Sequence, residues 1–302
     1  MTAPLPTVAL WAVNMATPVM TMDDWLARVE RQMHAAAEAG ADLLVMPEFA
    51  CEQWLGFAPP DLTEDKEIPW MGELAATVIP RLAGLVCETG IGLLPGTMPH
   101  AAAGGEWTNR AHLLLPEKDG VLHAVQDKLC LTPFEKEPGA WMLVPGSEFR
   151  IIEWRGLRIA ILICLDVELP ALSARLAPLA ADLILVPSMT EREAGYWRVF
   201  GCAKARAVEL QVIVCAVGTV GSLRLAARTE TNVSGAAVYV PCEPGLGHTG
   251  VIASVGPMAE SPDPLGHLLV VRDLPVDAVR SLRAGGAEVW PGCWQADGVR
   301  FV

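Results

Sequence analysis

Residues 7–49, TVALWAVNMATPVMTMDDWLARVERQMHAAAEAGADLLVMPEF, decide the fold. An apolar run over 7–15 is followed by a segment over 22–40 whose apolar residues recur every three or four positions, and then by a second apolar run over 41–49. This spacing predicts a strand, an amphipathic helix and a second strand. Asp23 or Asp24 can cap the helix, and Gly40 can end it. Strand, helix and strand in succession are typical of an α/β layer.

The same alternation continues along the chain. We expect a helix near 70–88, a strand over 91–98, strands over 110–115 and 121–129 that form a hairpin, and a second hairpin about Arg155 and Gly156. Helices and strands then alternate through ELPALSARLAPLAA, DLILVPS, GYWRVFGCAKARAVELQ and VIVCAVGTV. Strands GAAVYVPC, GVIASVGPM and HLLVVRDL precede a closing helix, PVDAVRSLRAG. Because no Ser- or Gly-rich linker interrupts the chain, we expect one domain with two similar sheet-and-helix layers and mixed sheets.

Composition excludes several classes of protein. The 302 residues are 52% hydrophobic, which predicts a folded globular chain. A net charge of −13 would repel a phosphate backbone, so no nucleic-acid partner is expected. We see no apolar stretch near the roughly 18 to 20 residues that span a bilayer, so no membrane partner is expected either. The N-terminus has no basic segment before its apolar run, unlike a signal peptide, so we expect a cytoplasmic protein.

Three short motifs carry no function by our interpretation. The eight cysteines show no paired spacing, no C-x-x-C and no histidine cluster, which indicates reduced thiols and no metal site. GLGHTG (245–250) fits G-x-G-x-x-G, but a strand-like segment follows it where a nucleotide site needs a helix, so we expect a plain loop. The sequon at Asn232 means little without a secretory signal.

Three polar residues stand at the ends of apolar strands. Glu48 follows ADLLVMP, Lys128 follows VLHAVQD and Cys164 follows RIAILI. Alone, each has an ordinary explanation as a solvated carboxylate, an edge lysine or a packed thiol. Together they matter more, because ligands of open α/β sheets bind at the carboxyl ends of strands. A base, an oxyanion partner and a nucleophile would then meet, and the helix after Cys164 would lower the pKa of its thiol.

With these residues in this order, the sequence resembles the nitrilase, or carbon–nitrogen hydrolase, superfamily. The matching pieces are ADLLVMPEFA, DKLCLTPFEKE, GLRIAILICLDVELPAL, ADLILVPS and CAKARAVELQVIVCAVG, and the likeness runs from about 7 to about 275. It implies a four-layer α-β-β-α sandwich with two mixed β-sheets. We expect a single domain over 1–280. A tail over 281–302, with Trp290 and Trp294, would wrap a neighbouring subunit or fold onto its own.

The resemblance also implies a chemistry. Cys164 would attack an amide, or less favourably a nitrile, while Glu48 takes and returns the proton. Lys128 and the backbone N–H of Leu165 would stabilise the oxyanion, and water would release the acid from a thioester. No metal or organic cofactor is required. Two alternatives stay open: an N-acyltransferase that uses the same thioester, and a non-catalytic binding protein on the same fold.

The resemblance extends to further residues. A second glutamate that helps to position substrate would be Glu135 or Glu137, and gapless counting favours Glu135. Leu165 departs from the family, in which an aromatic residue often follows the cysteine. We expect Asp166 to be structural, since an acid beside a thiolate raises its pKa.

Substrate choice falls to loops that sequence can only nominate. The alternative for the aromatic candidates Trp54, Tyr196 and Trp197 is a place in the core or in a subunit contact. Relatives pair through an outer helix, so we expect a homodimer or a higher oligomer, with GYWRVFGCAKARAVELQ and the helix after Cys164 as the interface candidates. The candidate pocket residues are Trp54, Ser188, Met189, Tyr196 and Trp197, with the region 231–234 beside them.

Overall fold

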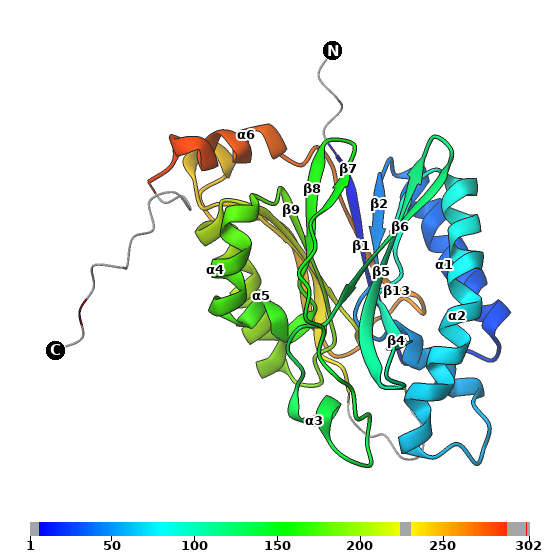
Figure 1. Ribbon diagram of the computed structural model, residues 1–302. Helices are drawn as coiled ribbons and strands as arrows, with labels where there is room; N and C mark the ends of the chain where they lie inside the picture. Colours follow the sequence, from blue (N-terminus) through cyan, green and yellow to red (C-terminus); the bar gives the residue numbers. More distant parts are fainter. Residues whose placement is uncertain (1–5, 224–230, 289–299, 301–302) are drawn as a thin grey trace.

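Two β-sheets pack face to face between two pairs of helices, as Figure 1 shows. The computed structural model describes residues 6–223, 231–288 and 300. Helices α1 (Met22–Glu38) and α2 (Glu64–Thr89) cover one sheet, and α4 (Pro170–Leu176) and α5 (Glu193–Leu210) cover the other. The expected four-layer α-β-β-α sandwich is confirmed.

Over the described residues, the first sheet has seven strands. Its centre is parallel, with β1 (Val8–Val13), β2 (Leu43–Val45) and β3 (Gly92–Leu94) side by side. Antiparallel pairs make it mixed, and they involve β4 (Thr97–Ala101), β5 (Trp107–Glu117), β6 (Gly120–Asp127) and β13 (Gly266–Val271). The single strand expected over 91–98 is wrong. The chain turns at Gly96, where φ is 82° and a Cβ would lie 2.0 Å from the Pro47 carbonyl oxygen.

The second sheet repeats the plan with six strands. The parallel centre is β8 (Leu157–Ile161), β9 (Leu183–Ser188) and β10 (Ile213–Gly218), flanked by β7 (Ile152–Trp154), β11 (Ser234–Tyr239) and β12 (Val251–Met258). β7 and β8 form the expected hairpin. Both turn residues, Arg155 and Gly156, have positive φ, which suits a tight two-residue turn between twisted strands.

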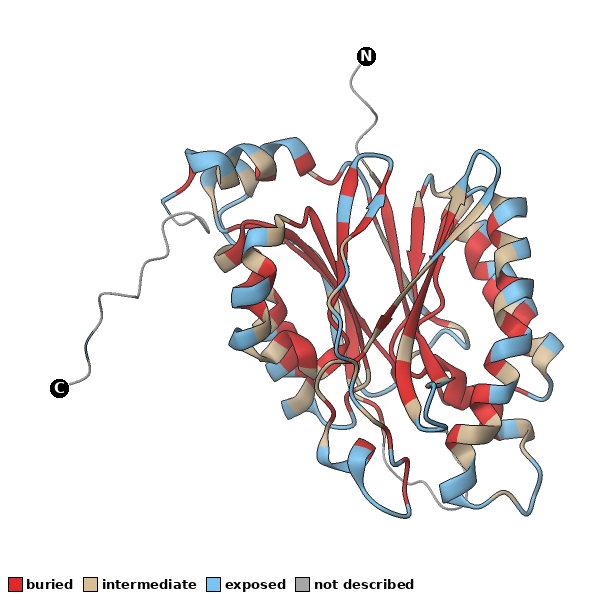
Figure 2. Cartoon of the chain, in the orientation of Figure 1, coloured by how far each residue is buried: buried red, intermediate tan, exposed pale blue. Residues whose placement is uncertain are grey.

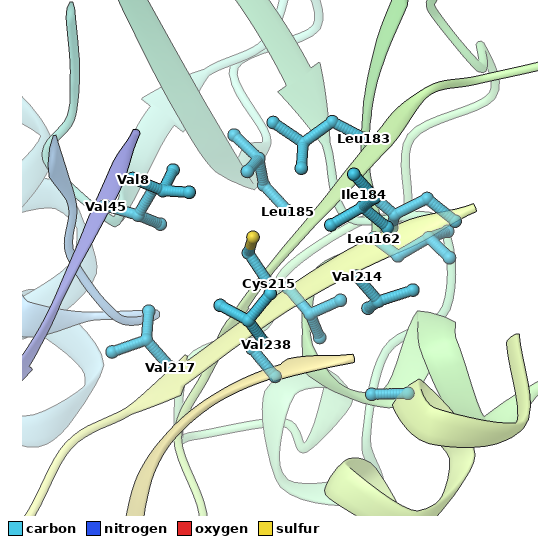
Figure 3. Packing of buried hydrophobic residues seen from close by; sticks show 14 of the residues in the cluster. Val8, Val45, Leu162, Leu183, Ile184, Leu185, Val214, Cys215, Val217 and Val238 are labelled. Carbon is cyan, nitrogen blue, oxygen red and sulfur yellow. The ribbon is translucent and has the colours of Figure 1, made fainter. Parts of the chain in front are cut away.

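The main core lies between the sheets. Along β1, Val8, Leu10 and Ala12 face the second sheet, while the residues between them face α1 and α2. Figure 3 shows Val8 and Val45 of the first sheet opposite Leu185, Cys215 and Val217 of the second. Strands buried on both faces need continuous apolar sequence, and Figure 2 shows the central strands buried almost throughout.

The outer helices differ from expectation in detail. Thr21, not Asp23 or Asp24, caps α1 by accepting a hydrogen bond from the Asp24 N–H. α2 begins at Glu64 and ends before Gly90. By length and composition this 26-residue helix is apolar enough to cross a membrane, so the expectation that no segment could do so was wrong. Its buried residues recur every three or four positions, as they do in a helix that packs on a sheet.

The chain after Cys164 is also more broken than expected. A 3₁₀ turn, η2 (Cys164–Glu168), precedes the seven-residue α4, and another turn, η3 (Ala177–Leu179), follows it. Strand β12 follows the GLGHTG segment, as expected for a plain loop. The remaining short elements are η1 (Ala50–Phe57), α3 (Pro133–Lys136), η4 (Pro244–Leu246), α6 (Val276–Ser281) and η5 (Leu282–Gly286). Trp290 and Trp294 lie outside the described residues.

Candidate active site

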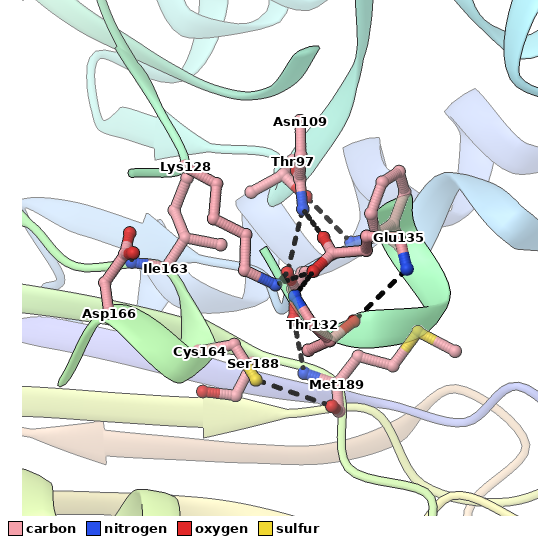
Figure 4. A network of polar contacts seen from close by, with 12 residues as sticks. Thr97, Asn109, Lys128, Thr132, Glu135, Ile163, Cys164, Asp166, Ser188 and Met189 are labelled. Carbon is pink, nitrogen blue, oxygen red and sulfur yellow. Dashed lines mark hydrogen bonds and ion pairs between the residues drawn. The ribbon is translucent and has the colours of Figure 1, made fainter. Parts of the chain in front are cut away.

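Glu48, Lys128 and Cys164 meet at the carboxyl ends of β2, β6 and β8, as Figure 4 shows for the lysine and the cysteine. The Lys128 ammonium lies 2.8 Å from Oε1 of Glu48 and 2.7 Å from Oε2 of Glu135. All four side chains are buried, and Cys164 is the most accessible of them at 6%. The positions nominated from sequence therefore form one connected group.

The backbone after β2 turns Glu48 toward this group. Phe49 adopts a left-handed conformation with φ of 47° directly after the glutamate. Its N–H donates to the Thr97 hydroxyl at 3.1 Å. A non-glycine residue with positive φ is strained, so the bond to Thr97 holds the turn that directs Glu48 inward.

A similar turn presents Cys164, and Asp166 holds it. Cys164 has φ of 48°. The Asp166 carboxylate accepts backbone N–H groups from Ile163 at 3.2 Å, Leu129 at 3.2 Å and Cys130 at 2.8 Å. Asp166 thus ties the segment after Lys128 to the turn at Cys164, the structural kind of contact that the sequence suggested. Burial raises the pKa of Asp166 to about 7, although these N–H groups oppose the rise.

Charges in the group are unevenly matched. Burial alone would lower the pKa of Lys128, but Glu48 and Glu135 outweigh it and raise that pKa, so the ammonium persists. Burial raises the pKa of the Glu48 carboxyl; Lys128 lowers it, and Glu135 raises it. Two carboxylates therefore share one ammonium in a site that water hardly reaches.

Further donors surround Glu48. Its Oε1 also accepts from Nδ2 of Asn109 at 2.8 Å, and its Oε2 accepts the Met189 N–H at 3.0 Å. The neighbouring Cys164 thiol also favours the ionised carboxylate. The Glu48 carboxylate is thus fixed at both oxygens. Oε1 contacts the Lys128 ammonium, and Oε2 accepts the N–H of Met189, the residue that follows β9.

The expected lowering of the thiol pKa is wrong. Burial and the neighbouring Glu48 raise the pKa of Cys164 well above its ordinary value, despite an opposing effect from Lys128. No α-helix begins at the thiol, because α4 starts only at Pro170. The Cys164 sulfur lies 3.5 Å from the Met189 carbonyl oxygen, to which the thiol donates.

Of the two glutamates considered after Lys128, the structure brings Glu135 into the group. Glu135 is 3% exposed, whereas Glu137 lies at the surface. A capping box fixes Glu135 at the start of α3: its N–H donates to the Thr132 hydroxyl, and its carboxylate accepts the Thr132 N–H at 2.8 Å.

The nominated pocket residues lie in different places. Met189 joins the group through its backbone. Ser188 ends β9 with its hydroxyl on the Val186 carbonyl oxygen. Trp54 is wholly buried edge-on against Trp25, and Tyr196 stacks on Phe200. Trp197 is 58% exposed on α5.

Sequence reasoning missed Thr97 and Asn109. Thr97 follows the turn at Gly96 that we read as continuous strand. Asn109 occupies the same face of β5 as Ala111, Leu113 and Leu115, all fully buried. An amide in that apolar row was a signal that could have been read.

One cluster in the described ranges 6–223 and 231–288 has the spacing of metal ligands: Glu30, His34 and Glu88, all exposed on α1 and α2. It lies outside the group around Lys128. Exposed carboxylates of this kind often stand without an ion, and we assign them no function.

Comparison with known proteins connects this geometry to a family. The carbon–nitrogen hydrolase family model matches residues 7–283. The chain is 26% identical over 268 residues to a Bacillus subtilis protein named "Probable hydrolase YhcX", covering 89% of this chain and 50% of that protein. It is 30% identical over 189 residues to an (R)-stereoselective amidase of a Pseudomonas species, covering 62% of each. The chain thus spans about half to two thirds of the length of these relatives.

A hydrolase of Mycobacterium tuberculosis is 30% identical over 260 residues, with 82% of each chain covered. Among solved structures, an amidase of Nesterenkonia sp. AN1 shares the fold, with a TM-score of 0.68, 24% identity and coverage of 93% of this chain and 97% of that one. The family match over nearly the whole sequence, on the fold just described, shows that the chain belongs to the carbon–nitrogen hydrolase family.

Proposed function

We propose that this protein hydrolyses the carbon–nitrogen bond of a small amide through a thioester on Cys164. The observation that carries the proposal is the proximity of three groups: a thiol, a carboxylate beside it that raises its pKa, and an ammonium 2.8 Å from that carboxylate. Such a set supplies a nucleophile, a proton acceptor and a cation for a developing oxyanion.

Acylation begins from a neutral thiol, because the pKa of Cys164 is raised. Glu48 removes the thiol proton as sulfur bonds to the carbonyl carbon, and the π electrons move to oxygen. Lys128 and the N–H of Leu165 stabilise that oxyanion. Leu165 is the second residue of η2, so its N–H has no partner within that turn. The carbon–nitrogen bond then breaks, and Glu48 gives its proton to the departing nitrogen.

Deacylation uses the same groups. Glu48 removes a proton from water, and the water oxygen bonds to the thioester carbon. When the carbon–sulfur bond breaks, the sulfur takes that proton back from Glu48, and the carboxylic acid leaves. The sum is amide and water to acid and ammonia or amine, with the enzyme unchanged.

Short aliphatic amides are the substrates to test first. A cysteine variant of the Nesterenkonia amidase was solved with butyramide, and a second variant of that enzyme carries the acetamide moiety of fluoroacetamide on its active-site cysteine. The buried site of this chain suits small acyl groups, since Cys164 is only 6% exposed.

A panel of amides and nitriles tests the proposal by the ammonia released. We expect at least one short amide to be turned over, and Cys164→Ala to lower its kcat/KM by about 10³-fold or more. Added hydroxylamine would reveal acyl transfer as hydroxamate. Unchanged turnover in Cys164→Ala would overturn the proposal, and so would hydroxamate formation without any hydrolysis.

A further inference from the structure

Asn109 is a buried amide on a strand face whose other buried residues are apolar. It lies on β5, fully buried, on the face that continues with Ala111, Leu113 and Leu115. Its backbone carbonyl accepts the Lys128 N–H at 2.8 Å, so it adjoins the lysine through the main chain as well. In Figure 4 its side chain points from β5 into the polar group.

The amide nitrogen serves both carboxylates. Nδ2 donates to Oε1 of Glu48 at 2.8 Å and to Oε1 of Glu135 at 3.1 Å. An amide nitrogen carries two hydrogens and cannot accept, so each hydrogen has its own carboxylate. A flipped amide would place its oxygen against two carboxylates, and this fixes the orientation.

The amide oxygen has no hydrogen-bond partner among the described residues, although it is fully buried. A buried acceptor without a partner destabilises a fold. An apolar residue of the same size would avoid that cost. The hydrogen bonds that Nδ2 donates to Glu48 and Glu135 therefore explain the Asn109 side chain better than packing does.

We infer that Asn109 is a positioning residue of this site, whose amide holds the Glu48 carboxylate toward Cys164 and spaces it from Glu135. The inference rests on the proposed role of Glu48 as proton acceptor. Lys128 alone cannot do this, because it contacts a different oxygen of Glu135 and leaves Oε1 of that residue to Asn109.

Asn109 also affects the proton affinity of Glu48. The titratable groups that face it are Lys128, Glu135 and the thiol of Cys164. Of these, Glu135 raises the pKa of Glu48. Donation from Asn109 favours both ionised carboxylates and counters that effect. Without the donor, Glu48 should hold its proton to higher pH, and a protonated carboxyl cannot accept one from the thiol.

Alkylation of Cys164 by iodoacetamide tests this without a known substrate. The rate is followed from pH 4 to pH 9 by mass spectrometry of the Cys164 peptide. We expect the acidic limb of the wild-type profile to move up by about one pH unit in Asn109→Leu, so that alkylation slows about tenfold at pH values below the limb. Asn109→Asp, which adds a third carboxyl, should move it further.

Gln211→Glu is the matched control. Gln211 is also a buried amide whose nitrogen donates, here to the Val208 carbonyl at 2.8 Å, and whose oxygen lacks a partner among the described residues. It precedes β10, at the opposite end of the strands from Cys164. We expect this variant to lower the melting temperature and to leave the acidic limb in place.

Two results would overturn the inference: an unmoved limb in Asn109→Leu, or a rate reduced equally at all pH values. Should neither Asn109→Leu nor Asn109→Asp fold, Asn109→Ser, which can donate to only one carboxylate, should give a smaller upward shift, and an unmoved limb there would overturn it too. Failure of the proposed function looks different, since wild-type Cys164 would then resist alkylation or show no acidic limb.

Discussion

The two halves of the molecule share a frame at one end of their strands and differ at the other. The segment ADLLVMPEF (41–49) contains β2, and the similar segment ADLILVPSM (181–189) contains β9. Each strand lies between two parallel neighbours, β1 and β3 in one sheet and β8 and β10 in the other. The two segments are thus similar in sequence and also occupy the same position, at the parallel centre of their sheets.

At the amino ends the two aspartates make equivalent bonds. Asp42 accepts the Thr7 N–H on its carboxylate, and its own N–H donates to the Thr7 carbonyl. Asp182 does the same with Arg158. The backbone carbonyl of each aspartate accepts an N–H from the third strand, at Gly92 or Ile213. Each half therefore starts its parallel strands with one carboxylate.

At the carboxyl ends the halves diverge. Glu48 and Ser188 are each the sixth residue after their aspartate. β2 stops at Val45, and the turn at Phe49 directs Glu48 into the site, whereas β9 continues through Ser188. The difference indicates that residues at the amino ends of the parallel strands stabilise the fold, while residues at the carboxyl ends supply the functional side chains, as in other α/β sheets. Substitutions at the two ends should accordingly fail in different ways.

The largest effect is expected at the carboxyl end. Glu48→Gln keeps the size of the side chain but cannot accept the thiol proton. We expect kcat/KM for an identified amide to fall by about 10³-fold, within the range for loss of a general base, while the urea midpoint stays within about 0.3 M of wild type. Steady-state kinetics and urea unfolding on the same preparation check this. Loss of fold together with activity would contradict the division between the two ends.

At the amino end the loss should be in stability. Asp182→Ala leaves Arg283 and the Arg158 N–H without their carboxylate, and the Asp182 side chain is only 1% exposed. We expect about 3 kcal/mol of destabilisation with kcat unchanged. Asp42→Ala should cost about 1 kcal/mol, since its side chain is 33% exposed and its partner Arg155 is 51% exposed. Urea unfolding of both variants measures the difference, and equal losses would refute the argument.

An effect smaller than that of Asp182→Ala should come from the β5–β6 hairpin of the first sheet. Burial, and then His123, lower the pKa of His112 to about 3, and its Nδ1 lies 3.0 Å from Nε2 of His123. An unfolded histidine titrates near pH 6.5. Because the folded state resists the proton, stability is complete above pH 6.5 and falls as the pH drops toward 3.

At pH 5 this histidine should cost about 2 kcal/mol relative to pH 7. His112→Leu removes that proton, so its loss of stability from pH 7 to pH 5 should be smaller than in wild type by about that amount. Urea unfolding at the two pH values measures it. The same pH dependence in variant and wild type would show that His112 is not the group responsible.

Much of the frame was predictable from sequence. Apolar runs separated by helical spacing predicted the succession of strands and helices along the chain, and polar residues at strand ends predicted Glu48, Lys128 and Cys164 as a group. These inferences need only local pattern and the rule that parallel strands end at one edge.

The rest depends on contacts that no local pattern encodes. Asn109 and Glu48 are 61 residues apart, and the pairing of β2 with β3 and of β3 with β5 brings that amide to the carboxylate. The thiol pKa was predicted in the wrong direction, because a helix was assumed where Pro170 delays it and because burial was not counted. Trp54 packs against Trp25, which lies 29 residues earlier on α1, and Tyr196 stacks on Phe200 one turn along α5.

The central claim is that Cys164 carries the acyl group during hydrolysis. Wild-type protein is mixed with an amide that it turns over, quenched in acid within the first turnovers, and digested for peptide mass spectrometry. We expect the Cys164 peptide to carry the mass of the acyl group, formed at least as fast as ammonia appears. Digests of Cys164→Ser prepared in parallel should contain no such thioester. Steady release of ammonia with Cys164 unmodified at every quench time, and full turnover by Cys164→Ala, would contradict it.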